Sequence, residues 1–389
     1  MKQVVVNTST YSSDEFGVCS ALYELGGMIV MHDASGCNST YTTHDEPRWY
    51  DIDSMIYISA ISEMEAIMGD DEKLIRDLTE TAKELDPAFI AIVGAPIPYM
   101  TGTDFKAIAN IVEQETGRFC FGFQTNGMEY YTQGISMALK EIADRFCIES
   151  APKPTDRIRV NILGATPLDF SVNGTVEAIR KWLSGRGFEP GCCFAMGCTL
   201  EEIFLASSAH VNLVISYGGL EAARLLEKRF GIPYIVGVPY GSVFPKLLES
   251  SIYQAAFTPR STVPYAAAKI TYGSEKKKQV AVIGESILSV SLASAIEMEY
   301  PDLNCKVLCP LDTESLLLRE GDLRTPEEET IRSRLQEADL VIADPLYRPL
   351  CPDKEFLNLP HTAFSGRIFE KEAPVLISDL SPLMEQIQH

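Results

Sequence analysis

The sequence has few basic residues for its size and contains no long apolar run. Its 389 residues include 33 lysines and arginines against 54 aspartates and glutamates, so the formal net charge is −21. A surface of that sign repels nucleic-acid phosphates and anionic membranes. No apolar run approaches the roughly 20 residues that a membrane-spanning helix needs, and the opening residues lack a signal-peptide cleavage pattern. We therefore expect a cytoplasmic protein with neither a nucleic-acid partner nor a membrane partner.

Nucleotide-binding motifs are missing as well. No predicted strand is followed by the spacing Gly-x-Gly-x-x-Gly, and the chain contains no Gly-Lys pair, which a phosphate-binding loop requires. The glycines within residues 94–104 also lack the spacing that cradles a phosphate. We therefore expect no direct nucleotide binding, and any ATP used with this protein would be hydrolysed by another one.

What the chain does contain is an alternation of short apolar segments with amphipathic ones. Near-continuous valine and isoleucine indicates strands buried on both faces, as in parallel sheets. Helical patterns at 70–86 and 218–233 lie between such strands, the first stopped by Pro87 and the second capped by Gly231. The alternation predicts doubly wound α/β units. The predicted strands are 28–32, 55–59, 88–94, 158–164, 211–216, 233–238, 279–284, 339–344 and 374–378, and Cys305 and Cys309 also have strand spacing.

Two polar linkers divide the chain. Residues 149–157 contain two prolines, residues 271–279 contain a glycine and three lysines, and each stretch leads into a predicted strand. We therefore expect three units: a first α/β domain at 1–151, a second at 152–274 and a third at 275–389.

The ten cysteines are expected to be reduced thiols or metal ligands in a cytoplasmic protein. Cys19 and Cys37 lie 18 residues apart, on either side of the strand at 28–32. Gly36 places Cys37 in a turn at the carboxyl end of that strand, where open α/β sheets bind ligands. Thiolates are the ligands that iron–sulfur clusters select. The alternative is that both cysteines are small core residues.

Several segments, in a fixed order, resemble a known family. They are GVCSALYELGGMIVMHDASGCNSTY, SEMEAIMGDDEKL, DPAFIAIVGAPIPYMTGTD, CTLEEIFLASSAHVNLVIS and LLEKRFGIPYIVGVPYGS. Together they resemble the nitrogenase component 1 family, which includes nitrogenase subunits, cofactor-assembly scaffolds, dark-operative protochlorophyllide reductase subunits and the nickel-tetrapyrrole reductive cyclase. The resemblance extends over about residues 12–250. It implies three doubly wound, Rossmann-like α/β domains around a central cleft.

The resemblance also implies a cluster site. Three first-domain cysteines of the family bind a cluster at a subunit interface, and two of these positions correspond to Cys19 and Cys37. The third corresponds to Ala95, which is not a ligand. Because a four-iron cubane cluster takes four ligands, the resemblance implies a cluster shared between subunits, in a homodimer or with a related partner subunit. Asp14 and Asp33 are nearby oxygen candidates.

The family's active-site cofactor is held by a second-domain cysteine and a third-domain histidine. Ser216 stands where the cysteine belongs, and His361 lies in a loosely similar segment, so we do not expect dinitrogen reduction. Cys192, Cys193 and Cys198 either bind a metal ion or line the cleft as thiols, with Cys192 and Cys193 on opposite faces of a strand.

Two further sites have alternative interpretations. His32, at the end of its strand, either supports the cluster or is a structural histidine. The aromatic stretch at 127–131 either shapes the cleft or packs within a helix.

The resemblance thus implies an oxidoreductase component. It would receive electrons from an ATP-hydrolysing iron protein through the interface cluster and reduce a substrate in the cleft. The substrate class stays open between a small molecule, a tetrapyrrole and a metallocluster. The alternatives are a non-catalytic scaffold for metallocofactor assembly and a cluster-free binding protein of the same fold.

Overall fold

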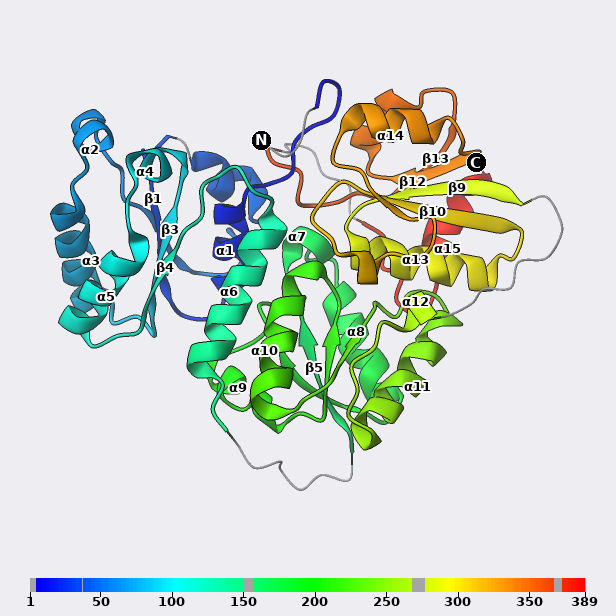
Figure 1. Ribbon diagram of the computed structural model, residues 1–389, viewed down its shortest axis with the longest axis horizontal. Coiled ribbons are helices and arrows are strands. Elements are labelled where there is room, and N and C mark those ends of the chain that lie inside the picture. The colour runs from blue at the N-terminus through cyan, green and yellow to red at the C-terminus, as the bar shows by residue number, and fades with distance from the viewer. Residues whose placement is uncertain (1–4, 37, 150–156, 268–276, 367–372, 389) are drawn as a thin grey trace.

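The computed structural model describes residues 5–36, 38–149, 157–267, 277–366 and 373–388. It contains three parallel β-sheets, each flanked by helices, which form three units (Figure 1). The first unit lies at the left of Figure 1, the second at the bottom and the third at the upper right. This architecture confirms the predicted α/β fold of doubly wound units.

The strand orders are β2-β1-β3-β4 in the first sheet, β6-β5-β7-β8 in the second and β11-β10-β9-β12-β13 in the third. Each order reverses once, between β1 and β3, between β5 and β7, and between β9 and β12. Ligand crevices form at the carboxyl ends of the strands at such points. The strands are β1 (Met28–His32), β2 (Met55–Ile58), β3 (Ile90–Gly94), β4 (Cys120–Phe123), β5 (Arg159–Leu163), β6 (Glu189–Cys193), β7 (Val211–Val214), β8 (Tyr234–Val236), β9 (Lys278–Ile283), β10 (Leu303–Cys309), β11 (Leu323–Arg324), β12 (Leu340–Ala343) and β13 (Glu355–Asn358).

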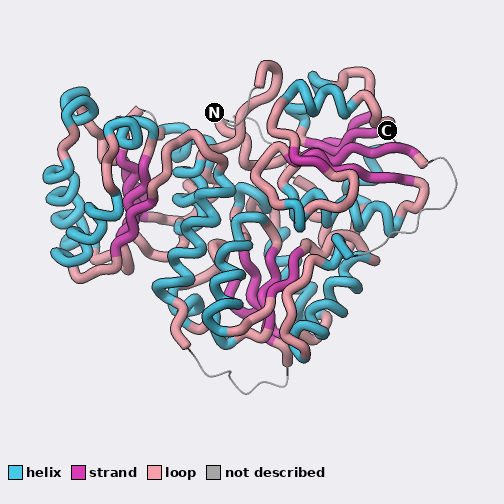
Figure 2. The backbone as a smooth tube through the Cα atoms, in the orientation of Figure 1, coloured by secondary structure: helices cyan, strands magenta, loops and turns pink. Residues whose placement is uncertain are grey.

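The connections between strands are mainly helical, as the tube in Figure 2 also shows. The α-helices are α1 (Asp14–Leu22), α2 (Glu63–Met68), α3 (Asp71–Leu85), α4 (Pro96–Thr101), α5 (Phe105–Thr116), α6 (Tyr131–Phe146), α7 (Pro167–Phe170), α8 (Thr175–Gly185), α9 (Leu200–Phe204), α10 (Leu220–Phe230), α11 (Phe244–Phe257), α12 (Pro264–Ala267), α13 (Ser286–Glu299), α14 (Glu328–Leu335) and α15 (Ser381–Met384). Short turns of other helix types are Tyr41–Asp45, Ala206–Ser208, Tyr217–Gly219, Ser315–Leu317, Pro345–Leu350 and Glu385–Gln388.

One predicted strand, at 374–378, is wrong. Only Ile377 forms isolated bridges, to Tyr240 and Gly241, and Leu376 accepts a hydrogen bond from the Gly241 N–H at 3.0 Å. The backbone groups of this segment are therefore satisfied by the loop after β8 in the second unit, and the segment does not join the third sheet. Its apolar residues stabilise the contact between units.

Helix α6 joins the first unit to the second. On one side it packs against α1, where glycines allow close approach: a Cβ added at Gly134 would lie 1.8 Å from the Asp14 carbonyl oxygen, and one at Gly17 would lie 2.1 Å from that of Tyr131. On the other side it contacts α10. A single hydrophobic core runs through these helices into the second and third sheets. Within the described ranges, no helix is both long and apolar enough to span a membrane.

The segment before α1 attaches to the third unit. The backbone N–H groups of Val6, Asn7 and Thr8 all donate to Glu328 Oε2, at 2.8–3.0 Å. These donors lower the pKa of Glu328 despite the opposing effect of desolvation. The Tyr11 ring stacks on Phe364 at 4.2 Å between centroids. Residues 6–11 therefore fix the third unit against the first.

Candidate functional site

Cys19 lies on α1, and its side chain has no exposed surface (0%). All residues of this helix are buried, since it is enclosed by α6 and by the first sheet. Burial, together with the nearby carboxylates of Glu15 and Glu46, raises the pKa of Cys19 well above its usual value. The free chain therefore holds Cys19 as a thiol, and a metal ion would have to displace its proton.

Buried carboxyl groups gather beside Cys19. Burial, with repulsion from Asp14 and Asp33, raises the pKa of Glu15 to about 8. Burial raises the pKa of Asp14 to about 6, although its carboxylate accepts hydrogen bonds from three backbone N–H groups, at 3.0, 2.8 and 3.1 Å. Glu15 Oε2 and Asp33 Oδ1 are buried without a hydrogen-bond partner among the described residues. Such orphaned atoms are rare in folded proteins, so these two oxygens are suited to a group that the described chain does not itself provide.

The other predicted ligand, Cys37, lies outside the described residues. The turn before it is open, because a Cβ added at Gly36 would meet no atom within 4 Å. His32 ends β1, and its Nδ1 lies 2.9 Å from Ser59 Oγ. Burial lowers the pKa of His32, which favours the neutral ring. These contacts support its interpretation as a structural histidine. Ala95, the position of the missing cysteine, is buried before α4.

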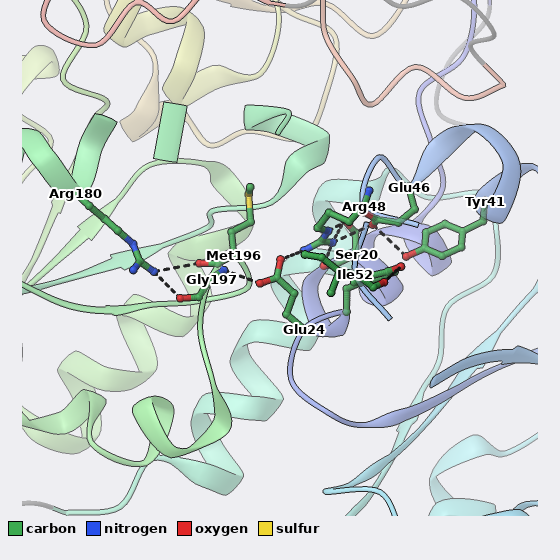
Figure 3. A network of polar contacts seen from close by, with 10 residues as sticks. Ser20, Glu24, Tyr41, Glu46, Arg48, Ile52, Arg180, Met196 and Gly197 are labelled. Atoms are coloured by element: carbon green, nitrogen blue, oxygen red, sulfur yellow. Dashed lines mark hydrogen bonds and ion pairs between the residues drawn. The ribbon is translucent and has the colours of Figure 1, made fainter. Parts of the chain in front are cut away.

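A buried arginine holds the α1 region together (Figure 3). Arg48 Nε donates to Glu46 Oε1 at 2.7 Å, and Nη1 donates to Glu24 Oε1 at 2.8 Å. Its Nη2 donates to the Ser20 carbonyl oxygen, one residue after Cys19, at 2.8 Å. Glu24 Oε2 in turn accepts the Gly197 N–H from the second unit at 2.7 Å. The helix that bears Cys19 is therefore bonded to a loop of the second unit.

An apolar patch lies exposed on α2 and α4, which contact one another. Met68 is 76% exposed and Met100 is 83% exposed. The patch is close to the cysteine turn, since the Ile61 N–H, just before α2, donates to the Asp33 carbonyl oxygen at 3.0 Å. Contiguous exposed apolar side chains of this kind mark interaction surfaces. The α2/α4 patch consists of Met64, Ile67, Met68, Tyr99 and Met100.

A small cavity lies where the three units meet. Its polar lining comes from the carboxyl ends of strands in two sheets: Asp169 follows β5, Glu285 follows β9 and Asp344 follows β12. His361, beyond β13, and Tyr11 from the first unit complete it. The space is about 60 Å³, enough for a few water molecules. None of the described residues that line it is a lysine or an arginine.

Asp169 is the centre of the polar contacts in this cavity. Its Oδ1 accepts a hydrogen bond from the Tyr131 hydroxyl at 2.6 Å and lies 3.5 Å from His361 Nε2. Its Oδ2 is buried with no partner among the described residues. Glu285 is also fully buried, and burial together with the charge of Asp169 raises the pKa of Glu285 to about 7. The cavity thus holds one acid, Glu285, whose pKa lies near neutral pH.

The sequence pattern identified only His361 among these cavity residues. It does not mark Asp169, Glu285 or Tyr131 as individual site residues, although Tyr131 ends the aromatic stretch at 127–131 that one interpretation places at the cleft. For Asp169 and Glu285 the sequence did offer one signal: they come after the predicted strands 158–164 and 279–284, and α/β sheets bind ligands at the carboxyl ends of such strands. Ser216 lies after β7, and its hydroxyl donates to the Gly164 carbonyl oxygen at 2.7 Å, so it is already satisfied within the backbone.

The three clustered cysteines of the second unit separate into two environments. Cys192 Sγ and Cys198 Sγ lie 3.1 Å apart, whereas Cys193 interacts with the Arg180 guanidinium. This agrees with the expectation that Cys192 and Cys193 face opposite sides of a strand. Across the described ranges, no three histidine, cysteine or acidic side chains are placed to hold a metal ion.

Comparison with known proteins identifies a family. Residues 16–243 match the sequence profile described as nitrogenase component 1 type oxidoreductase. A nitrogenase iron–molybdenum cofactor biosynthesis protein of Clostridium pasteurianum is 26% identical over 46% of this chain and 39% of its own length. A light-independent protochlorophyllide reductase subunit of Heliobacterium modesticaldum is 27% identical over 47% of this chain and 35% of its own length.

Further comparisons agree with this family and fold. A nitrogenase molybdenum–iron protein alpha chain of Methanothermobacter marburgensis is 25% identical over 45% of this chain and 37% of its own length. The aligned part of the chain thus spans less than two fifths of each of these relatives. A solved structure described as nitrogenase Cp1 at pH 5 matches with a TM-score of 0.64 over 93% of this chain and 85% of its own, at 13% identity. At that identity the structural match establishes the fold alone.

Proposed function

This chain belongs to the nitrogenase component 1 type oxidoreductase family, and from that premise we propose that it is the catalytic component of a two-component reductase. It accepts electrons from an ATP-hydrolysing iron protein through an iron–sulfur cluster at a subunit interface and reduces a substrate in the cavity between its units. One observation carries the proposal. The helix that bears Cys19 packs against α6, and the first residue of α6, Tyr131, donates its hydroxyl to Asp169 in the cavity.

The residues around Cys19 fit a cluster in their donor chemistry. Cys19 is a thiol beside the unpartnered oxygens of Glu15 and Asp33, and Cys37 supplies a second thiol. Ala95 supplies no ligand, so two chains, or this chain and a related subunit, are needed for four ligands. When bound, such a cluster supplies one-electron transfer.

The chain's own residues supply protons in the cavity. Reduction commonly adds protons as well as electrons, and Glu285 holds a proton near neutral pH because burial and Asp169 raise its pKa to about 7. Asp169 accepts a hydrogen bond from the Tyr131 hydroxyl and lies 3.5 Å from His361 Nε2. The acidic lining favours a neutral or cationic substrate. The volume of about 60 Å³ favours a small molecule over a tetrapyrrole or a metallocluster.

We assign the α2/α4 patch to the iron protein. The centre of the patch is apolar and includes Met68 and Met100, and acidic residues such as Asp70 and Asp71 lie at its edge. This is the composition of a transient docking surface. The patch adjoins Asp33 and hence the cysteine turn. A reductase bound there would lie close to the cluster, as electron transfer between proteins requires.

Anaerobic purification of the full chain tests the cluster. We expect a coloured dimer or heteromer with iron and sulfide, and loss of that iron in Cys19→Ala. Cys120→Ala is the matched control, because Cys120 is a buried cysteine on β4 of the same unit. A colourless wild-type protein without iron would leave the cluster-free binding protein as the function. A cluster that no ATP-hydrolysing iron protein reduces would favour the assembly scaffold.

The docking surface is tested with Met68→Asp. We expect ATP-dependent binding of the iron protein to weaken by about tenfold or more, the effect of losing a central interface residue. Phe257→Asp is the control, since Phe257 is 79% exposed on α11 of the second unit. Equal binding by the two variants would refute the assignment. A change in oligomeric state in Met68→Asp would show that the patch binds a second copy of the chain instead.

A further inference from the structure

Two buried thiols of the second unit lie almost within bonding distance. Cys192 Sγ on β6 and Cys198 Sγ in the following loop are 3.1 Å apart, and both residues are buried. Cys193 is directed elsewhere, and its pKa is raised to about 12 by burial although Arg180 opposes the shift. The pair therefore consists of Cys192 and Cys198 alone, and a two-electron disulfide is the chemistry open to it.

The loop that brings Cys198 to Cys192 has an unusual backbone. Ala195 has φ +84°, a conformation that costs energy for a residue with a Cβ, and Gly197 has φ +58°. Arg180 Nη2 fixes the loop by donating to the carbonyl oxygens of Met196, at 3.2 Å, and Gly197, at 2.7 Å. A strained backbone held by several bonds indicates a functional constraint, and here the constraint keeps the two sulfurs together.

The same loop is bonded to the helix that carries Cys19 (Figure 3). The Gly197 N–H donates to Glu24 Oε2 at 2.7 Å, and Arg48 Nη1 donates to Glu24 Oε1 at 2.8 Å. Arg48 Nη2 then donates to the Ser20 carbonyl oxygen at 2.8 Å. A movement of Cys198 also moves its neighbour Gly197 and therefore changes the hydrogen bond from the Gly197 N–H to Glu24.

We propose that Cys192 and Cys198 form a reversible disulfide whose state is transmitted through Glu24 and Arg48 to α1. The oxidant is a small disulfide of the glutathione class. The Cys198 thiolate attacks one of its sulfurs and releases one small thiol, and Cys192 attacks the mixed disulfide and releases the second. The chain loses two electrons and two protons, which the two small thiols carry. Cys198 itself is buried, but Gly197 and Thr199 are exposed on either side of it, so the oxidant reaches its sulfur when this exposed loop opens locally.

Bond formation requires a movement of about 1 Å, from 3.1 Å to the roughly 2.05 Å of a disulfide. The inference goes beyond the proposed reductase function and does not depend on it, because thiols can be counted without any cluster. If the disulfide does not form, the proposed reductase function still stands, and if the chain binds no cluster, the disulfide proposal still stands.

The full chain, kept anaerobic in glutathione buffers of graded composition, tests the pair. Samples are quenched in acid, alkylated and analysed by peptide mass spectrometry. In an equimolar buffer we expect the linked Cys192–Cys198 form to exceed the free thiols, and to be lost in Cys198→Ser and in Cys192→Ser. Cys193→Ser is the matched control and should retain it. Alkylation of both thiols across the series, or a bond that includes Cys193 instead, would overturn the proposal.

Hydrogen exchange tests the transmission. Amides of residues 14–24 should exchange about fivefold faster in the oxidised chain, the factor that corresponds to one net hydrogen bond. Glu24→Ala should remove that difference while disulfide formation continues. Equal exchange in the reduced and oxidised wild-type chain would overturn the transmission.

Discussion

Replacing Glu285 with glutamine tests whether the cavity is built around an acid that keeps its proton near neutral pH. Glu285 precedes α13 and accepts hydrogen bonds from the Leu288 N–H at 2.9 Å and the Tyr217 N–H at 3.1 Å. Burial and the adjacent Asp169 raise its pKa from 4.5 to about 7. The folded chain therefore binds more protons at this position than the unfolded chain does between those two values.

The contribution of Glu285 to wild-type stability consequently falls as the pH rises from about 4.5 to about 7. The raised pKa corresponds to a penalty of about 3 kcal/mol for ionising Glu285 in the folded chain, which is complete above about pH 8 and absent below the ordinary pKa of 4.5. In Glu285→Gln this pH dependence should disappear. The amide also leaves one backbone N–H without an acceptor, at a cost of about 1–3 kcal/mol at every pH. The variant should thus be less stable than wild type at pH 5 and about equal to it at pH 8.

Amide hydrogen exchange of α13, corrected for intrinsic rates, measures this effect locally. A local measurement is needed because a chain of three units does not unfold in one two-state step. Glu329→Gln is the control, since the Glu329 side chain on α14 is 88% exposed. Asp169→Asn should reduce the pH dependence as well, because it removes the like charge beside Glu285. The reasoning is refuted if Glu285→Gln and wild type show the same change in opening free energy between pH 5 and pH 8.

Two packing predictions follow from the α1 region. Gly134→Ala should lower the local opening free energy of α1, measured by hydrogen exchange, by about 2 kcal/mol, because its Cβ would lie 1.8 Å from the Asp14 carbonyl oxygen. Gly185→Ala is the control and should have no effect, because its Cβ would meet nothing within 4 Å. Arg48→Met should lower the same local free energy by about 3 kcal/mol, because it leaves buried carboxylates unpaired. Arg76→Met, on a side chain 59% exposed, should change it by less than about 0.5 kcal/mol.

All the strands missed from sequence lie at the edges of the sheets. Strands with neighbours on both sides are buried on both faces, and their continuous apolar residues made β1, β3 and β5 predictable. The missed strands β4, β6, β11 and β13 are all edge strands, whereas the edge strands β2 and β8, with the apolar sequences MIYI and YIV, were found. Edge strands tolerate polar residues, proline and glycine, and β6, with the sequence EPGCC, lacks the apolar pattern for this reason.

The residues of the candidate site also differ in whether the sequence alone could identify them. Cys19 and His361 could be proposed from local sequence because each lies in a segment that resembles a family motif. No neighbouring residue in the sequence distinguishes Asp169 or Glu285 from other acids. Their carboxyl groups come from the second and third units, and Asp169 can raise the pKa of Glu285 only when these units pack together. The contact between Cys192 and Cys198 likewise depends on the strained turn at Ala195, which no residue pattern in the sequence predicted.

The sequence by itself determined the α/β class and the place along the chain of most interior strands. These follow from apolar periodicity, turn residues and residue identity, which act over a few neighbours along the chain. Only the tertiary structure decided which acids share a cavity, which thiols pair and how α1 is bonded to the second unit. Burial, carboxyl repulsion and hydrogen bonds between distant segments depend on distances that arise only when the units pack together.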